Sequence, residues 1–264
     1  MPATLSTRNL RRKLIRITWL LTVAFVAAPK VFSQSTDIKA ELRQRFQNKI
    51  FLIQGWYQDD DLKYDSSGVV VGTPKRGSWA ESVVKVRSIK VRRKDIVLRC
   101  HRGGFAYDSK TKKFAPLIAD KREVTITIQA DPATLTPANL DTLEHAVLAQ
   151  TAKLDDVPEY WREFLVRGDQ DPKKDSRGAT TQGEVVAAVQ SNGHPVFRIG
   201  SGVTAPRALK HDEPGFTEVA RQTRYQGTVV LSSVIDDQGV PTQIKIEKAL
   251  GMGLDDAAVN SVEQ

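Results

Sequence analysis

Two apolar runs near the end of the chain, residues 227–235 and 241–250, constrain the fold more than any other feature of the sequence. The second run alternates isoleucine with lysine and glutamate, and a period of two is typical of a strand with one buried face. The connection between the runs contains Gly239, which can adopt the positive φ that a tight return turn needs. The sequence therefore predicts an antiparallel β-hairpin.

Helical patterns flank this predicted hairpin on both sides. An amphipathic segment precedes it and carries Pro214, Phe216, Val219 and Ala220. After the hairpin, Leu254, Ala258 and Val262 recur at every fourth position, and two aspartates stand where a helix N-terminus favours negative charge. The predicted order is helix, hairpin, helix.

The region around the predicted hairpin resembles the C-terminal domain of the TonB family of periplasmic energy transducers. The shared pattern has a proline and aromatic pair, an Ala-Arg helix, a glycine before alternating valines, an Asp-x-x-Gly turn, and Gly-x-x-Leu-Asp-x-Ala-Ala. In this chain the pattern stands at Pro214 and Phe216, Ala220 and Arg221, Gly227 and Val229, Asp236 and Gly239, and Gly251 with residues 254–258. The resemblance covers about residues 205–264. Family members continue into a last strand, so we expect this domain to be incomplete, truncated before its final strand.

The resemblance implies a protein-interaction module of the periplasm or cell envelope, with no catalytic side chain. It implies that a sheet edge docks a peptide of an outer-membrane TonB-dependent receptor by β-strand addition and transmits energy for transmembrane transport. A homodimer is a further option. The alternative function is an exported ligand-binding or scaffolding protein of the envelope without energy transduction. That alternative stays open because the N-terminal segment has no histidine and the 12 prolines form no spacer, two features through which family members reach a membrane motor.

The N-terminus has the pattern of a targeting segment. Four cations, Arg11, Arg12, Lys13 and Arg16, precede an apolar run at residues 17–28. That run is short for a membrane span but suits the core of a signal peptide. Val31 and Ser33 are placed for cleavage before Gln34. We therefore predict a signal peptide over residues 1–33 and export, with an uncleaved inner-membrane anchor as the alternative.

The net charge of +8 is concentrated in the predicted signal peptide. Six of the 39 basic residues lie in residues 1–33, which hold no acidic residue, so the rest of the chain has 33 basic and 31 acidic side chains. A nearly neutral mature chain argues against nucleic acid as a partner.

Residues 34–152 form a predicted β-rich domain with flanking helices. A helix is expected over residues 37–50, and a second helix begins at Pro137 and presents Leu140, Leu143, Val147 and Leu148. Strand patterns occur at residues 51–53, 68–72, 82–91, 96–100 and 123–129, with turn signals between them. This rhythm predicts an antiparallel meander or a small barrel.

Residues 153–204 are a predicted linker that leads to the TonB-like domain at residues 205–264. The linker contains a short helix over residues 157–166 with Tyr160, Trp161, Phe164 and Leu165 as its anchors. A polar loop at residues 167–178 and a hairpin at residues 184–199 follow. The fold class is therefore α+β: an antiparallel β-rich domain followed by a small αββα domain.

Few residues suggest a chemical site, and we expect no catalytic, cofactor-binding or metal-binding residue. Asp59, Asp60, Asp61 and Asp65 are hard oxygen ligands, but their spacing does not match an EF-hand and a solvated turn explains them. Cys100 and His101 are neighbours on a strand, which sends their side chains to opposite faces, so a buried cysteine and an exposed histidine are expected. Residues 211–213, His-Asp-Glu, are interpreted as a polar connector.

A basic run occupies the middle of the predicted β-rich domain. Its members are Lys85, Arg87, Lys90, Arg92, Arg93, Lys94, Arg99 and Arg102, and Asp95 is the one acidic residue among them. Alternation along the strands would place several of these cations on one face of the sheet. They could attract polyanions such as envelope glycolipids. The simpler interpretation is a solvated face whose charges discourage edge pairing.

Overall fold

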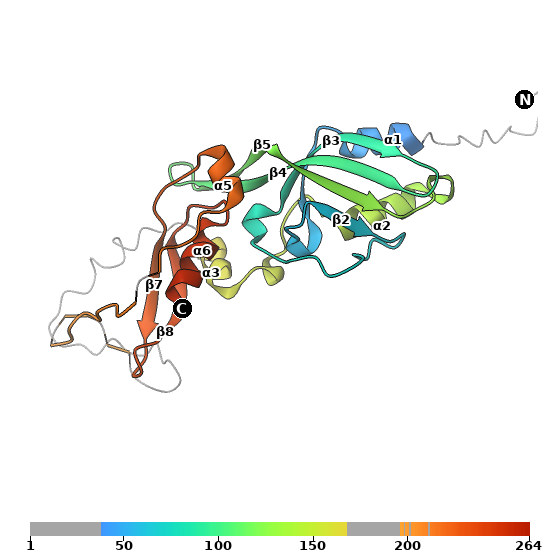
Figure 1. Ribbon diagram of the computed structural model, residues 1–264. Helices are drawn as coiled ribbons and strands as arrows, with labels where there is room; N and C mark the ends of the chain where they lie inside the picture. Colours follow the sequence, from blue (N-terminus) through green and yellow to red (C-terminus); the bar gives the residue numbers. More distant parts are fainter. Residues whose placement is uncertain (1–37, 168–195, 198, 201, 211) are drawn as a thin grey trace, which may run out of the picture. The chain divides into compact units, whose positions relative to one another are not determined.

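The computed structural model describes residues 38–167, 196, 197, 199, 200, 202–210 and 212–264. Six strands form one sheet: β1 (Ile50–Ile53), β2 (Asp61–Tyr64), β3 (Val83–Val91), β4 (Ile96–Asp108), β5 (Lys113–Ile128) and β6 (Leu148–Ala149). Their order is β2-β5-β4-β3-β1-β6 (Figure 1). The pairings are antiparallel except that between β2 and β5, which is parallel.

The strand register places most apolar side chains of the sheet on one face. On β4, Ile96, Leu98 and Cys100 are buried in the core, whereas Arg99 is exposed on the other face; Val97, on the same face as Arg99, is buried outside this core. Their partners on β5 are Ile128, Ile126 and Val124, which are also buried. This period of two gives the sheet one core face and one polar face.

Two helices cover the core face. Helix α1 (Ile38–Phe46) buries Leu42 and Phe46, and helix α2 (Pro137–Val147) buries Leu140, Leu143 and Val147. Thr136 caps α2 by accepting a hydrogen bond from the Asn139 amide. All of these side chains belong to one core with the apolar residues of β1 to β5. Burial against the sheet holds these short helices, since isolated helices of this length are marginal in water.

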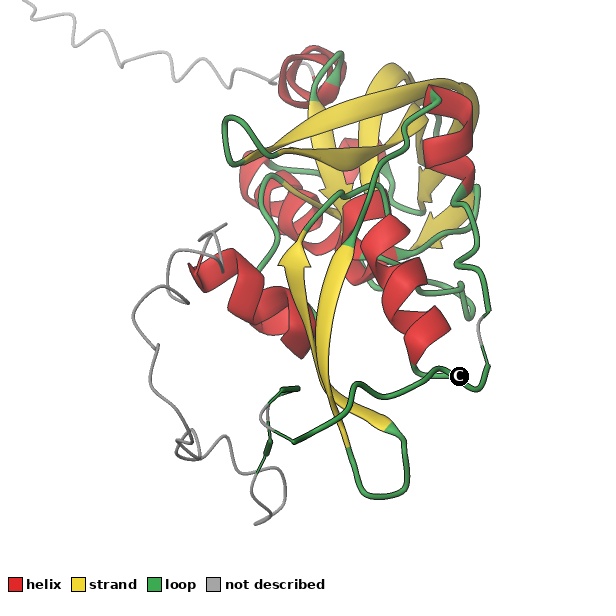
Figure 2. Cartoon of the chain, turned by 90° about the vertical axis from the view of Figure 1, so that its left-hand side faces the viewer, coloured by secondary structure: helices red, strands yellow, loops and turns green. Residues whose placement is uncertain are grey.

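The C-terminal part contains a two-stranded sheet and three helices (Figure 2). The strands β7 (Val230–Ile235) and β8 (Pro241–Lys248) form an antiparallel hairpin. The helices are α3 (Glu159–Arg167), α5 (Glu218–Thr223) and α6 (Leu254–Val262). Four short 3-10 helices complete the described secondary structure: η1 (Gln54–Trp56), η2 (Trp79–Glu81), η3 (Pro132–Thr134) and η4 (Leu154–Asp156).

The α+β class is confirmed, and so is the order helix, hairpin, helix at the C-terminus. The meander is confirmed for β3, β4 and β5, whereas the parallel partner β2 was not predicted because aspartates dominate the sequence before it. The sheet has edges at β2 and β6 and is not a closed barrel.

Two local predictions are wrong. The first helix ends at Phe46, and Ile50 already belongs to β1. Residues 68–72 form no strand: only Val70 bridges to Tyr64, because Gly68 and Gly72 take positive φ values of 83° and 92° that interrupt extended backbone.

Other predictions fall on residues that the structure leaves out. The predicted signal peptide, the polar loop and most of the predicted second hairpin lie outside the described residues. The four predicted segments of the chain, residues 1–33, 34–152, 153–204 and 205–264, and the three boundaries between them stay predictions. Within the described part of the chain, no helix has the length and apolar character that crossing a membrane requires.

Candidate interaction site

The β7–β8 hairpin is held by its turn and by an irregular ladder. Gly239 has a φ of 86° at the turn. The Asp236 carboxylate accepts hydrogen bonds from the amides of Gln238 and Val240 at 2.9 and 2.8 Å, which fixes the loop without help from the rest of the molecule. The register shifts between Val230 and Leu231 and again between Ser232 and Val234, so β7 carries bulges.

The two strands of the hairpin differ in burial. No residue of β7 is buried, and Val230 and Ile235 are 44% and 38% exposed. On β8, Ile246 is buried and Ile244 is half-buried, so the predicted inner face is only partly covered. Among the strands that the structure describes, β7 pairs with β8 alone.

Helix α3 packs against β8. Trp161 and Phe164 of α3 join Ile246 in a cluster with Trp79 and Tyr107. Trp161 is fully buried, and its ring lies edge-on to Trp79 with 5.2 Å between the ring centroids. The Nζ atom of Lys245 lies 2.9 and 3.0 Å from the two carboxylate oxygens of Glu163, which adds an ion pair to this contact. The prediction of a helix with these aromatic anchors is confirmed, although α3 begins two residues later than predicted.

A backbone connection joins the segment after β8 to the far end of β4. The Tyr107 amide donates to the Leu250 carbonyl at 2.8 Å, and the Met252 amide donates to the Phe105 carbonyl at 2.7 Å. Gly251 lies between these bonds with a φ of 91°, and a Cβ there would approach the Phe105 carbonyl oxygen to 2.1 Å. Only glycine therefore permits this close approach of two backbones.

The carboxylate of Asp256, at the start of α6, joins three separate segments. It accepts hydrogen bonds from the Ser78 hydroxyl at 2.6 Å, the Tyr160 hydroxyl at 2.7 Å and the Trp161 indole nitrogen at 3.1 Å. Burial raises the pKa of Asp256, and the three donors oppose that rise by favouring the ionised form. From the sequence, Asp256 was expected only to place a favourable negative charge at the N-terminus of a helix.

Two more carboxyl groups are buried beside this one. The Asp255 carboxylate is fully buried and accepts hydrogen bonds from the amides of Leu250 and Gly251, at 2.8 Å and about 2.5 Å. Burial still raises its pKa to about 7. Burial likewise raises the pKa of Glu81, at the end of η2, to about 7, and the charge of Asp256 adds to that rise while those of Arg122 and Arg102 oppose it. Three carboxyl groups with raised pKa values thus lie at the contact between α6 and the segment around η2.

The comparison with known proteins identifies this part of the chain. Residues 212–264 match the family described as Gram-negative bacterial TonB protein C-terminal. The chain carries a TonB-type C-terminal domain. This match supports a TonB-like protein-interaction role in the cell envelope and a domain family that is not enzymatic. No curated protein and no solved structure matches the chain.

The TonB-type domain contains α5, β7, β8 and α6, and α5 completes its contact with the six-stranded sheet. Val219 and Ala220 of α5 are buried with Met252 and Leu254. The Thr217 hydroxyl caps α5 and also donates to the Met252 carbonyl at 2.7 Å. The domain therefore packs against the rest of the described chain through α5 and α6 as well as through β8.

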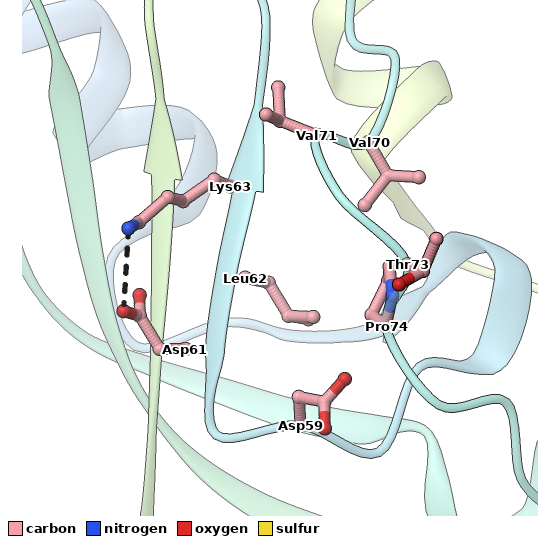
Figure 3. Close-up of a pocket in the computed structure, with 8 residues that line it drawn as sticks. All are labelled: Asp59, Asp61, Leu62, Lys63, Val70, Val71, Thr73 and Pro74. Atoms are coloured by element: carbon pink, nitrogen blue, oxygen red, sulfur yellow. Dashed lines mark ion pairs between the residues drawn. The ribbon is translucent and has the colours of Figure 1, made fainter.

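Away from the TonB-type domain, two of the four aspartates singled out in the sequence, Asp59 and Asp61, line an open pocket. A cavity of about 270 Å³ is lined by Asp59, Asp61, Leu62, Lys63, Val70, Val71, Thr73 and Pro74 (Figure 3). Both carboxylates have partners: Asp59 accepts from the Lys75 amide at 2.7 Å, and Asp61 lies 3.9 Å from the Lys63 Nζ atom. Asp65 instead caps its own turn by accepting from the amides of Ser67 and Val69. No group of three or more potential metal ligands occurs among the described residues, and the expected absence of a metal site stays a prediction.

The remaining candidates are not brought together into one site. Cys100 is buried, as predicted, and burial raises the pKa of its thiol to about 12. His101 is half-buried rather than exposed, and its Nδ1 atom lies 3.4 Å from Asp120. In the predicted connector, Asp212 forms an ion pair with Lys210 at 2.6 Å, whereas His211 lies outside the described residues.

Arg102 differs from the other cations of the basic run because its side chain is fully buried. Its guanidinium donates to the carbonyls of Tyr57 and Asp59 at 3.0 and 2.8 Å and lies 3.8 Å from the Asp60 carboxylate. Burial lowers its pKa to about 10. The other cations of the run lie at or near the surface. Alternation in the sequence could not separate Arg102 from them, since its partners lie far away in the sequence, in the loop at residues 57–60 and at the Glu81 carbonyl.

Proposed function

We propose that the TonB-type domain is a protein-interaction module of the cell envelope that docks an extended peptide of an outer-membrane receptor. The peptide would add as a strand to the outer edge of β7. One observation carries this proposal: β7 pairs with β8 alone among the described strands, and none of its residues is buried. An edge strand with free backbone groups is the structure that strand addition requires.

The contacts of the hairpin favour β7 over β8 as the docking edge. Helices α3 and α6 both pack against β8, and the ion pair between Lys245 and Glu163 and the buried Ile246 strengthen that contact. A peptide that added to β8 would have to displace part of these contacts, whereas one that added to β7 would not.

Side chains on β7 would contribute to specificity. Val230 and Ile235 are exposed at the two ends of the strand and could contact apolar side chains of the peptide. The Ser232 hydroxyl donates to the Glu247 carboxylate of β8 at 2.6 Å, which holds the middle of the ladder. Main-chain hydrogen bonds would provide affinity, and the exposed side chains would fix the register.

We further propose that the chain is exported through residues 1–33 and acts in the periplasm. Pull on the docked peptide would pass from β7 to β8 and then to the six-stranded sheet through Asp256 and the backbone bonds around Gly251. Coupling of this pull to transport is the energy-transduction part of the proposal.

Binding of receptor plug peptides to matched lysine variants tests the docking edge. We expect Val230→Lys to weaken binding at least about tenfold, because a lysine on an edge strand opposes edge pairing. Val240→Lys is the control: Val240 is 50% exposed in the turn, so the chemical change is the same but the edge is untouched. Equal binding by both variants, or no binding by the unmodified protein, would contradict the proposal.

The second candidate is an envelope ligand-binding or scaffolding protein without energy transduction, and the pocket beside β2 favours it. The cavity of about 270 Å³ combines two carboxylates and an amine with the apolar Leu62, Val70 and Val71. If receptor-dependent uptake is unchanged in cells that lack the protein, while plug peptides fail to bind, this second function replaces the first.

A further inference from the structure

The six-stranded sheet has a polar face that carries an excess of positive charge. The strand register brings Lys85 and Lys90 of β3, Arg99 of β4 and Lys63 of β2 onto this face. Between them lie Thr125 and Thr127 of β5, and the same register puts two acidic residues, Asp61 of β2 and Glu123 of β5, on this face, so four cations stand against two carboxylates. Helices α1 and α2 pack on the opposite face, with the core.

The β3–β4 hairpin concentrates this charge. Residues 85–99 contain seven basic side chains and one acidic side chain, Asp95. Asp95 lies 3.7 Å from the Arg92 guanidinium. For the other six cations, the described part of the chain offers no carboxylate within 4.0 Å: Lys85, Arg87, Lys90, Arg93, Lys94 and Arg99. Lys85 is half-buried, and the other five cations are exposed. The register places Lys85, Lys90 and Arg99 on the polar face, Arg87 lies at the bulge of β3, and Arg93 and Lys94 lie in the turn between β3 and β4. We call these six residues the cationic face.

We propose that the cationic face docks on a membrane surface that bears anionic phosphate headgroups. The inference uses the envelope location of the proposed function, which would place the protein near such surfaces. The six cations are spread along two neighbouring strands, about 4.8 Å apart, and the turn that joins them, so they form an extended array that matches a layer of headgroups better than a single small anion.

The composition of the face also favours a membrane over a single-stranded nucleic acid. The paired segments that carry the cations, residues 83–91 of β3, 96–101 of β4 and 123–128 of β5, contain no phenylalanine, tyrosine or tryptophan. Nucleic-acid grooves of that type need aromatic platforms on which bases stack. Long lysine and arginine side chains can instead extend their charged ends to headgroups while their stems remain on the sheet.

Sedimentation with lipid vesicles tests the proposal. The full chain is expected to bind vesicles that contain phosphatidylglycerol and not vesicles of phosphatidylcholine alone, and the binding should fall steeply as salt is added. In the test variant, Lys90, Arg93, Lys94 and Arg99 are all changed to glutamine. Because each cation near an anionic surface contributes about 1 kcal/mol, we expect this variant to bind about 100-fold or more weakly.

The control variant changes Lys110, Lys113, Lys153 and Lys248 to glutamine, which removes the same net charge from exposed positions outside the cationic face. It should keep most of the binding. Equal loss in both variants would overturn the assignment to this face, as would unchanged binding by the test variant. Binding to a soluble polyanion such as heparin without binding to the vesicles would overturn the membrane as partner.

Peptide binding separates this inference from the proposed function. The test variant should bind receptor plug peptides like the unmodified protein, because none of its four substitutions lies on β7 or β8. Circular dichroism checks that both variants are folded. Failure of vesicle binding alone would overturn the inference and leave the docking proposal intact.

Discussion

The two sheets of this protein are stabilised in different ways. The six-stranded sheet has its own continuous core, in which α1 and α2 cover side chains from β1 to β5. The β7–β8 hairpin has one fully buried side chain, Ile246, and its neighbours in that cluster come from α3, η2 and β4. A two-stranded hairpin is marginal on its own in water. This difference indicates that the stability of the TonB-type hairpin depends on the rest of the chain, whereas the stability of the six-stranded sheet does not depend on the hairpin.

Among the substitutions considered, Trp161→Ala should destabilise the hairpin most strongly. Trp161 is fully buried between the hairpin and the six-stranded sheet, so its removal leaves a cavity and should cost about 3 to 5 kcal/mol in the stability of the hairpin. Residue-resolved hydrogen exchange should show loss of protection in β8 but not in the middle of β4.

Leu98→Ala is the matched control for the other core, because Leu98 of β4 is buried in the core that α1 and α2 cover. It should lower protection in both sheets. If Trp161→Ala lowered protection in β4 as much as in β8, the two regions would be one cooperative unit and the comparison would be wrong.

Two glycine variants compare the contribution of a close backbone approach at Gly251 with that of a positive φ alone at Gly239. Gly251→Ala should destabilise the contact between α6 and β4 by at least about 2 kcal/mol, since a Cβ meets the Phe105 carbonyl in addition to the strained φ of 91°. Gly239→Ala has a similar φ of 86° with no heavy atom within 4 Å of the added Cβ, so about 1 kcal/mol is expected. Urea denaturation followed by tryptophan fluorescence measures both. Equal losses would show that the close approach at Gly251 contributes nothing.

Tyr160→Phe should have a smaller effect. It removes one of the three donors to the buried Asp256 carboxylate and leaves the ring in place, so a loss of about 1 kcal/mol is expected. Urea denaturation at pH 8 is the measurement. A variant as stable as the unmodified protein would mean that the Asp256 contacts do not hold the TonB-type domain to α3.

Glu81→Gln should change the pH dependence more than the stability at one pH. Because burial raises the pKa of Glu81 from 4.5 to about 7, the contribution of this group to stability is fully present below about pH 4.5 and is lost as the pH rises through about 7. Glutamine is never ionised, so the stability of the variant relative to the unmodified protein should increase between pH 5 and pH 8. A relative stability that stays constant over this range would exclude burial as the dominant influence on Glu81.

Short-range sequence patterns predicted the helices and strands of this protein. They could not predict the long-range contacts that bring these elements together. The hairpin, its turn at Gly239 and the aromatic side chains of α3 follow from periods of a few residues. The Asp256 hydrogen bonds to Trp161 and Ser78 join residues 95 and 178 positions apart, and no sequence period carries such information. Arg102 illustrates the same limit, because its burial depends on carbonyls of the loop at residues 57–60. The hairpin of the candidate site was predictable from the sequence, but the different burial of β7 and β8 was not.

Hydrogen exchange along β7 with and without a receptor plug peptide tests the central claim most directly. In an antiparallel pair, every second amide of β7 points away from β8 and is free to bond an added strand. We predict that these outward amides gain protection in the complex while the amides of β8 and α3 are unchanged. Protection that appeared only on β8, or a bound peptide that left β7 unprotected, would contradict docking by strand addition at the open edge of the hairpin.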